Sequence, residues 1–285
     1  MNEQLLNSET IQSIVQLALR EDAAYNDITT TNLIPNHHHE NFSLIANEEG
    51  ILSGLKLLKE VMNQMSENIQ IKLMKDDGDA IKTGDLICEI SGPINKILSG
   101  ERVALNFLQM LSGISSLTYE FIQKMNSNQI IIRDTRKTRP LLRKLEKYAV
   151  ACGGAYNHRM DLSSAILIKD NHIAAAGGLK NAEAFTRSIH PKIPVELEVD
   201  SIMQIEEAKD IELDGFLLDN MTPEETKACV KLIRKFKDGD SIFIESSGSI
   251  TLETLPDYVW TGIDAVSIGA LTNQANSVDM KLELR

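Results

Sequence analysis

The chain has 285 residues, of which 42% are hydrophobic and 25% charged, and its formal net charge at pH 7 is −12. These values are ordinary for a globular protein of one large domain or two smaller ones. The acidic balance argues against general affinity for nucleic acid or for an anionic membrane surface. No apolar run approaches the ~18 residues that a membrane-spanning helix requires.

The cysteines and the first residues of the chain indicate the cellular compartment in which we expect the protein. Cys88, Cys152 and Cys229 lie far apart and form no CxxC pair. The first residues show no basic region followed by an apolar stretch, so we expect no signal peptide. Together these features favour a reducing, cytoplasmic setting.

The N-terminal part of the chain mixes helical and strand-like segments. Apolar residues at helical spacing predict a helix over 9–20, followed by a loop over 22–35. Short strands are predicted over 42–46 and 50–54, and a second helix over 55–65.

Residues 76–92 alternate in short stretches separated by glycines, which predicts a small β layer. Biotin and lipoyl carrier domains share this rhythm, and Met74-Lys75 resembles a biotin-acceptor dipeptide. A carrier needs its lysine at the tip of a hairpin, whereas Lys75 precedes the Asp-Asp-Gly turn. We therefore favour a structural β layer over a carrier module.

A long helix is predicted over 100–125, with Ser99 as its N-cap and a break near Gly113. Arg102 falls in the first turn, where the helix dipole mildly disfavours a cation. This placement invites a functional explanation, although exposed arginines are also common.

After residue 128 the pattern changes to short apolar runs, each followed by helix-like sequence. The runs are Ile130–Ile132, Ala165–Ile168, Val195–Val199, Phe216–Leu218, Ile242–Ile244 and Ala265–Ile268, with Ala155–Arg159 as a candidate seventh. This alternation predicts parallel βα units. Glu196 and Glu198 alternate with apolar neighbours and would both face the lumen of a barrel. We therefore favour a barrel, with an open parallel sheet as the alternative.

Charged residues gather after the predicted strands. Residues 133–147 hold seven basic side chains and two acidic ones. In an acidic protein this suggests a site for a small, multiply charged anion. The alternative without a functional role is a solvent-exposed basic helix face. Arg136 and Arg159 can bind carboxylates bidentately, whereas Glu198 and Asp219 suit Mg²⁺ held together with substrate phosphates. The predicted substrates are a carboxylated small molecule and a metal-bound sugar phosphate.

Taken singly, such residues have ordinary structural explanations. Lys169 could be an ion-pair partner and His158 a hydrogen-bonded core histidine. Asp219 could cap a helix that starts near Thr222. The histidines at 37–39 are adjacent rather than spaced on one face, so we interpret them as a loop feature and not as a metal site.

Short motifs recur in order along nearly the whole chain. They run from Asp27-Ile28-Thr29-Thr30 to Gly269-Ala270-Leu271-Thr272 and include Glu101-Arg102, Asp134-Thr135-Arg136-Lys137, Asn157-His158-Arg159, Lys169-Asp170-Asn171-His172, Glu196-Leu197-Glu198, Asp219-Asn220 and Glu245-Ser246-Ser247-Gly248. Together they resemble the quinolinate phosphoribosyltransferase family. The resemblance implies an α/β fold of two domains: an N-terminal α/β sandwich over 1–112, joined by the tail 272–285, and an incomplete parallel βα barrel over 113–271 that carries the active site.

The resemblance further implies transfer of phosphoribosyl from phosphoribosyl pyrophosphate to quinolinate with decarboxylation, giving nicotinate mononucleotide, pyrophosphate and CO2 in NAD biosynthesis. It implies Mg²⁺ as cofactor and a homodimer with shared active sites, arranged as a hexamer in some members. Arg102 would reach the active site of the neighbouring subunit. The other substrate-binding residues would be Thr135, Arg136, Lys137, His158, Arg159, Lys169, Glu198, Asp219, Ser247, Gly248, Ser249, Gly269 and Ala270, with Lys137, Lys169, Glu198 and Asp219 catalytic and Glu198 and Asp219 on the metal.

Two positions depart from the family pattern. Ser249 stands where the family usually has a second glycine, and Arg139-Pro140-Leu141-Leu142 replaces a more usual Thr-Pro-Gly-Leu. Neither departure touches a residue assigned to direct chemistry, so both bear on loop motion and affinity more than on activity.

Three alternatives stay open. A related transferase could act on nicotinate or another aromatic acid, although a single carboxylate does not need so many cations. A relative associated with molybdenum transport is disfavoured by the intact Lys169-Asp170-Asn171-His172. A non-enzymatic sensor of pyridine carboxylates, built on a barrel that has lost its activity, would not need both Glu198 and Asp219.

Overall fold

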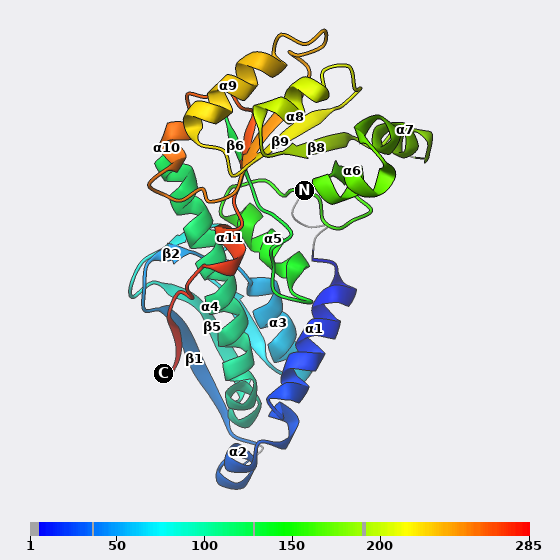
Figure 1. Cartoon of the computed structure of the whole chain (residues 1–285). Helices are drawn as coiled ribbons and strands as arrows, with labels where there is room; N and C mark the ends of the chain where they lie inside the picture. Colours follow the sequence, from blue (N-terminus) through cyan, green and yellow to red (C-terminus); the bar gives the residue numbers. More distant parts are fainter. Residues whose placement is uncertain (1–5, 36, 128, 190–191) are drawn as a thin grey trace. The chain divides into compact units, whose positions relative to one another are not determined.

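The computed structural model describes residues 6–35, 37–127, 129–189 and 192–285, and it divides into two compact units (Figure 1). Unit 1 comprises residues 1–119, 140–154 and 274–285, and unit 2 comprises residues 120–139 and 155–273. The predicted domain boundary between residues 112 and 113 stays a prediction. The first five residues, where no signal peptide is expected, lie outside the described ones.

Unit 1 combines antiparallel strands with helices. Its strands are β1 (His39–Ala46), β2 (Gly50–Ile51), β3 (Gln70–Leu73), β4 (Ala80–Ile81), β5 (Leu86–Pro93) and β12 (Met280–Leu284). Its helices are α1 (Ser8–Glu21), α2 (Ile28–Leu33), α3 (Leu55–Met65), α5 (Arg143–Cys152) and most of α4 (Ile94–Met125), with a 3-10 turn at Ala24–Asn26. One sheet has the order β12-β1-β5-β3, and a second joins β2 to β4. The chain end therefore completes the main sheet of this unit.

The first two helices predicted in unit 1 form as expected, but the prediction over 22–35 is wrong. α1 begins after Asn7, whose side chain accepts a hydrogen bond from a first-turn amide at 2.8 Å, and α3 has the predicted bounds. The loop predicted over 22–35 is wrong because α2 forms within it. Asp27 accepts hydrogen bonds from two first-turn amides at 3.0 Å, and this N-cap stabilises a helix of β-branched residues whose helix propensity is low.

α4 is longer than predicted and has no break at Gly113. It begins at Ile94, so Ser99 lies inside the helix, where its hydroxyl donates to the Asn95 carbonyl at 2.8 Å. A Cβ at Gly113 would lie 1.9 Å from the Asn276 carbonyl oxygen. The glycine therefore permits close approach of the C-terminal tail and does not serve as a kink. Within the described parts of the chain, no helix is both long and apolar enough to cross a membrane.

Unit 2 contains a six-stranded sheet whose strand pairs are parallel. Its strands are β6 (Ile131–Arg133), β7 (Ile166–Ile168), β8 (Val195–Val199), β9 (Gly215–Asp219), β10 (Phe243–Ser247) and β11 (Ala265–Ser267). Its helices are α6 (Asp170–Ala176), α7 (Leu179–Ile189), α8 (Ile202–Glu207), α9 (Pro223–Ile233), α10 (Leu255–Tyr258) and α11 (Ala270–Asn273). The order β6-β11-β10-β9-β8-β7 is that of a βα barrel left open between β6 and β7. The predicted incomplete barrel is thus confirmed.

The candidate seventh strand is reduced to a single bridge. Tyr156 pairs in parallel with Arg133; its amide donates to the Ile132 carbonyl at 2.9 Å, and its carbonyl accepts from the Asp134 amide at 3.1 Å. Among the described strands, β7 pairs only with β8. We call the open side of the barrel, between Tyr156 and β7, the seam.

β8 confirms the predicted alternation. Its apolar residues are buried, whereas Glu196 and Glu198 are only partly buried and share the opposite face. Gly215 on β9 pairs with Glu196, and a Cβ there would lie 3.2 Å from the Glu196 Cγ. The glycine therefore leaves room for a carboxylate inside the barrel.

We expect Gly113→Ala to lower the free energy of unfolding by more than about 3 kcal/mol, because the added Cβ must displace backbone. The control is Gly100→Ala in the same helix, where the Cβ would meet the flexible Met65 side chain at 2.9 Å. That variant gains helix propensity and should stay within about 1 kcal/mol of wild type. Chemical denaturation followed by circular dichroism measures both, and equal stabilities would contradict the close approach of the tail.

Candidate active site

The carboxyl ends of four strands form one row. In the sheet register Arg133 lies beside Ser267, Ser267 beside Ser247, and Ser247 beside Asp219. The predicted site residues after β6, β10 and β11 follow directly on this row. We call this edge of the barrel the rim; barrel enzymes bind their substrates at the corresponding edge.

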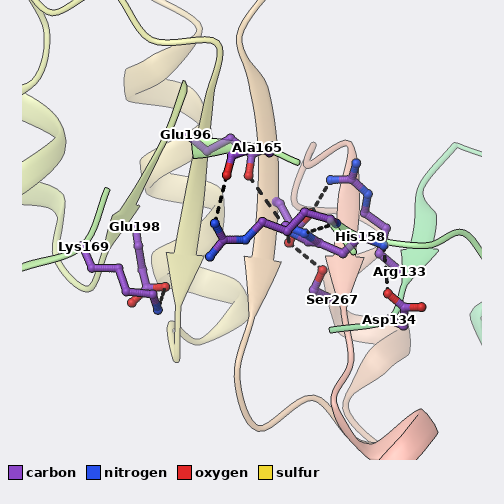
Figure 2. Close-up of polar contacts among 10 residues, drawn as sticks. Arg133, Asp134, His158, Ala165, Lys169, Glu196, Glu198 and Ser267 are labelled. Atoms are coloured by element: carbon purple, nitrogen blue, oxygen red, sulfur yellow. Dashed lines mark hydrogen bonds and ion pairs between the residues drawn. The ribbon is translucent and has the colours of Figure 1, made fainter. Parts of the chain in front are cut away.

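Lys169 and Glu198 are brought together at the rim. Lys169 follows β7 directly, and its ammonium group pairs with the Glu198 carboxylate on β8 (Figure 2). The two side chains are 41% and 21% exposed, so a small ligand can reach the pair. The Lys169 amide also donates to the Nδ1 atom of His172 at 3.0 Å, which fixes the turn into α6.

Asp219 ends β9, and its Oδ2 atom accepts a hydrogen bond from the Asn220 side chain at 2.9 Å. It does not cap the next helix. Thr222 caps α9 in a capping box with Glu225, and Pro223 occupies the first turn. The structural explanation considered for Asp219 is therefore wrong.

Arg136 and Arg159 form a cationic pair at the rim. Burial, followed by repulsion from Arg136, lowers the pKa of Arg159, although Glu196 and Glu198 act in the opposite direction. The buried Nε atom of Arg136 has no hydrogen-bond partner within the described part of the chain. Such a donor costs about 1–3 kcal/mol. An anionic ligand would relieve both the repulsion and the unmet donor.

Arg159 also bridges the seam. Its Nη1 atom donates to the Ala165 carbonyl, just before β7, at 3.0 Å. This bond uses one of the five guanidinium donors. The same side chain thus ties the two edges of the open barrel near the start of β7, and its charge adds to that of Arg136.

Below the rim, Glu245 is 1% exposed and lies among polar side chains inside the barrel. Its carboxylate accepts hydrogen bonds from Arg133 Nη1 at 2.7 Å and from Ser267 Oγ at 2.5 Å. His158 Nε2 lies 3.3 Å from the same carboxylate. Burial acts to raise the pKa of Glu245, but the hydrogen bond and the charge of His158, followed by the charge of Arg133, outweigh it, and the pKa is lowered. Glu196 lies 3.9 Å from the same His158 nitrogen, and burial, then Glu245, raise its pKa. The lumen thus favours one ionised carboxylate over two.

Asp134 is fully buried and holds the segment that carries His158. Its carboxylate accepts hydrogen bonds from the Asn157 side chain at 2.6 Å and from the His158 amide at 2.8 Å. The backbone of this segment is therefore fixed although it forms no regular strand.

The loops after β9 and β10 are locked together. The Asn220 amide donates to the Ser247 carbonyl at 2.7 Å, and Ser249 Oγ donates to Asn220 Oδ1 at 3.3 Å. A Cβ at Gly248 would lie 2.2 Å from Asn220 Oδ1, so the loop requires glycine there. Loops at this place commonly bind phosphate through backbone amides in barrel enzymes.

Gly269 and Lys137 are in close contact at the end of β11. A Cβ at Gly269 would lie 3.0 Å from Lys137 Cδ, and the Thr272 hydroxyl donates to the Lys137 carbonyl at 2.7 Å. The Lys137 amide donates to Thr135 Oγ1 at 3.0 Å. Thr135, Lys137, Gly269 and Ala270 therefore form one continuous part of the rim.

The basic segment 133–147 is not a single solvated helix face. Its first part belongs to unit 2 and carries the rim cations, whereas its last part lies in unit 1, where Lys147 is fully buried. Arg102 is exposed on α4 in unit 1, and its role at a neighbouring active site stays a prediction.

Both departures from the family pattern fall at left-handed backbone. Leu141 has φ = 67° and Ser249 has φ = 54°, a region that favours glycine. Leu141 is also 87% exposed, so no burial of its side chain offsets the strain. These are the two positions at which the resemblance described above implies glycine.

The described residues contain no group of three or more His, Cys, Asp or Glu side chains suited to a metal ion. Mg²⁺ commonly takes only one or two protein carboxylates beside waters and substrate phosphates, so Glu198 and Asp219 fit that ion. The histidine run was expected in a loop, but His39 begins β1, and His38 contacts Glu40 at 3.1 Å.

Sequence reasoning did not single out Glu245 or Asp134 as parts of the site. Glu245 interrupts an apolar run two residues before the strand ends, which is the signal that identified Glu196 on β8. Asp134 directly follows β6 and reads as an ordinary strand end. Only the tertiary contacts show that it holds the His158 segment.

Two family models match the chain: the N-terminal domain of quinolinate phosphoribosyl transferase over residues 27–112 and its C-terminal domain over 114–283. The probable nicotinate-nucleotide pyrophosphorylase (carboxylating) of Bacillus subtilis is 38% identical over 280 residues, covering 98% of this chain and 95% of the relative. The crystal structure of NadC from Streptococcus pyogenes is 40% identical, with a TM-score of 0.91 and coverage of 98% and 99%. The nicotinate-nucleotide pyrophosphorylase of Francisella tularensis is 34% identical, with a TM-score of 0.92 and coverage of 98% of both chains.

Replacing Leu141 or Ser249 by glycine should stabilise the protein. We expect Leu141→Gly to raise the free energy of unfolding by about 0.5–1 kcal/mol, because relief of left-handed strain exceeds the added chain entropy. Ser249→Gly should gain less because it loses the bond to Asn220. The control is Leu162→Gly, an exposed leucine outside the left-handed region, which should be neutral or destabilising. Thermal unfolding measures all three, and a loss of stability in Leu141→Gly would contradict the strain argument.

Proposed function

The chain belongs to the quinolinate phosphoribosyltransferase family, and from this we infer that it makes nicotinate mononucleotide for NAD biosynthesis. It transfers phosphoribosyl from phosphoribosyl pyrophosphate to quinolinate and releases pyrophosphate and CO2. The relatives of the same length carry this activity in their names, and the chain covers nearly all of each.

The observation that carries the substrate assignment is the cationic pair of Arg136 and Arg159. Their mutual repulsion and the unmet Nε donor of Arg136 call for an anion with more than one acceptor. Two adjacent ring carboxylates meet that demand, because each can take one planar guanidinium. Lys169 adds a third cation on the far side of the seam.

The phosphoribosyl half of the site is assigned to the remaining rim residues. Glu198 and Asp219 are proposed to bind the ribose hydroxyls and Mg²⁺, whereas loop amides and Lys137 take the phosphates. The proposed phosphate-binding residues are Thr135, Lys137, Ser247, Gly248, Ser249, Gly269 and Ala270. Arg102 is proposed to serve the site of a neighbouring subunit in a homodimer.

In the proposed mechanism, the quinolinate ring nitrogen attacks the anomeric carbon as pyrophosphate leaves. The carboxylates of Glu198 and Asp219 stabilise the positive charge that develops on the sugar, and Lys137 and Lys169 neutralise the leaving group. Glu198 and Asp219 would hold Mg²⁺, which would further neutralise the charge of the pyrophosphate. The 2-carboxylate then leaves as CO2, and its electron pair stays on C2, where the positive charge of the adjacent quaternised nitrogen stabilises it. C2 finally takes up a proton from solvent to give nicotinate mononucleotide. Much of the rate gain comes from the cationic residues that position both carboxylates.

The direct test is a coupled assay with purified protein, Mg²⁺, phosphoribosyl pyrophosphate and either quinolinate or nicotinate. We expect nicotinate mononucleotide from quinolinate alone, because a single carboxylate leaves one guanidinium unpaired. Turnover with nicotinate would favour the related transferase. Binding of quinolinate without turnover would favour a sensor.

Arg159→Ala should raise KM for quinolinate by about 10–100-fold and leave KM for phosphoribosyl pyrophosphate nearly unchanged, since it removes a charged hydrogen-bond donor from one half of the site. The matched control is Arg187→Ala. Like Arg159, Arg187 lies in unit 2 and donates to a backbone carbonyl at 3.0 Å, but it is outside the rim. Full quinolinate affinity in Arg159→Ala would remove Arg159 from the pocket.

A further inference from the structure

The Thr272 side chain joins the ends of two neighbouring strands. It is fully buried; its hydroxyl donates to the Lys137 carbonyl at 2.7 Å and lies 3.2 Å from the Gly269 carbonyl. Lys137 follows β6 and Gly269 follows β11, and these two strands are paired in the sheet. One buried hydroxyl therefore contacts the backbone beyond both strand ends.

The backbone on both sides of the Lys137 side chain is held by hydrogen bonds. Its amide donates to Thr135 Oγ1 at 3.0 Å, and its carbonyl accepts from Thr272. The Lys137 alkyl chain also packs against Gly269, where an added Cβ would lie 3.0 Å from Lys137 Cδ. Lys137 itself is exposed, so a ligand can reach its side chain. Of these contacts, the Thr272 hydrogen bond is the one that fixes the Lys137 backbone to the segment after β11.

Thr272 is itself held at its backbone. Its amide donates to the Gly269 carbonyl at 3.3 Å, and its carbonyl accepts a hydrogen bond from Arg139 Nη1 at 3.2 Å. Because Arg139 belongs to the same segment as Lys137, this segment and α11 are tied at two points. Two such points fix the orientation of the segment, whereas a single bond would leave it free to rotate.

We propose that Thr272 is a positioning residue for the phosphoribosyl pyrophosphate half of the site and that it acts through Lys137. Its hydroxyl keeps the Lys137 side chain beside Gly269, where the phosphates are proposed to bind. A ligand does not reach Thr272 itself, because the residue is fully buried. The proposal rests on the proposed function, since it assigns a positioning residue to the phosphate site described there.

The first test compares Thr272→Val with Thr272→Ser in steady-state kinetics. Valine keeps the shape of the side chain but has no hydroxyl. We expect Thr272→Val to raise KM for phosphoribosyl pyrophosphate about tenfold and to leave KM for quinolinate within about twofold of wild type, because only one half of the site loses its positioning. Thr272→Ser keeps the hydroxyl, so both KM values should stay within about twofold of wild type.

Three results would overturn the proposal: an unchanged KM in the valine variant, equal rises for both substrates, or a serine variant as impaired as the valine variant. Should Thr272→Val not fold, Thr272→Ala takes its place in each comparison, because it also removes the hydroxyl.

The matched control is Thr261→Val. Thr261 is also buried and donates to a backbone carbonyl, that of Tyr258, at 2.8 Å, but it precedes β11 and lies outside the rim. Since it loses a bond of the same kind, it should lower the melting temperature about as much as Thr272→Val and leave KM for phosphoribosyl pyrophosphate within about twofold of wild type. An equal rise of this KM in the control would trace the effect to lost stability and overturn the positioning role.

Amide hydrogen exchange of the full chain gives a readout that does not depend on the substrate. In Thr272→Val the segment 135–139 should exchange at least about threefold faster than in wild type, whereas Thr272→Ser and Thr261→Val should leave it unchanged. Equal exchange in wild type and Thr272→Val would overturn the proposal even in an active enzyme. A wild-type protein that does not turn over quinolinate would instead count against the proposed function, and the exchange measurement would still decide whether Thr272 holds Lys137.

Discussion

A carboxylate buried inside a barrel has to be neutralised, and the arrangement of unit 2 depends on how this is done for Glu245. Arg133 reaches it from β6 across the intervening β11, and Ser267 reaches it from β11 itself. His158 reaches it from the segment that bridges to β6. These contacts keep the strand ends in register, and the row of rim residues follows from that register.

The interior and the rim of the barrel differ in how their charges are paired and exposed. Inside, charges are paired and exposure is low, as for Glu245 at 1%. At the rim, Lys169 and Glu198 pair while partly exposed, and Arg136 and Arg159 repel each other. Interior pairs stabilise the fold and orient what lies above, whereas the unbalanced charges at the rim are the ones that a ligand can satisfy.

Glycine and the left-handed region mark the places where packing limits the sequence. Gly113 gives the C-terminal tail its place against α4, and Gly248 permits the contact with Asn220. At Leu141 and Ser249 the chain carries a side chain where the backbone favours none. The strain at these two positions is local, so it bears on loop stability and leaves the register of the barrel strands unchanged.

The sequence by itself determined the parallel βα architecture, the inward face of Glu196 and Glu198, and most of the rim residues, because strand alternation and polar strand ends are local signals. It could not show that α2 forms or that α4 continues through Gly113, since the Asp27 cap and the approach of Asn276 depend on chain geometry. It also could not show that Arg133, His158 and Ser267 converge on Glu245 from positions as far as 112 residues away in sequence. Only the register of the paired strands decides such contacts, because a side chain's partners across a barrel are set by strand order and not by its neighbours in the chain.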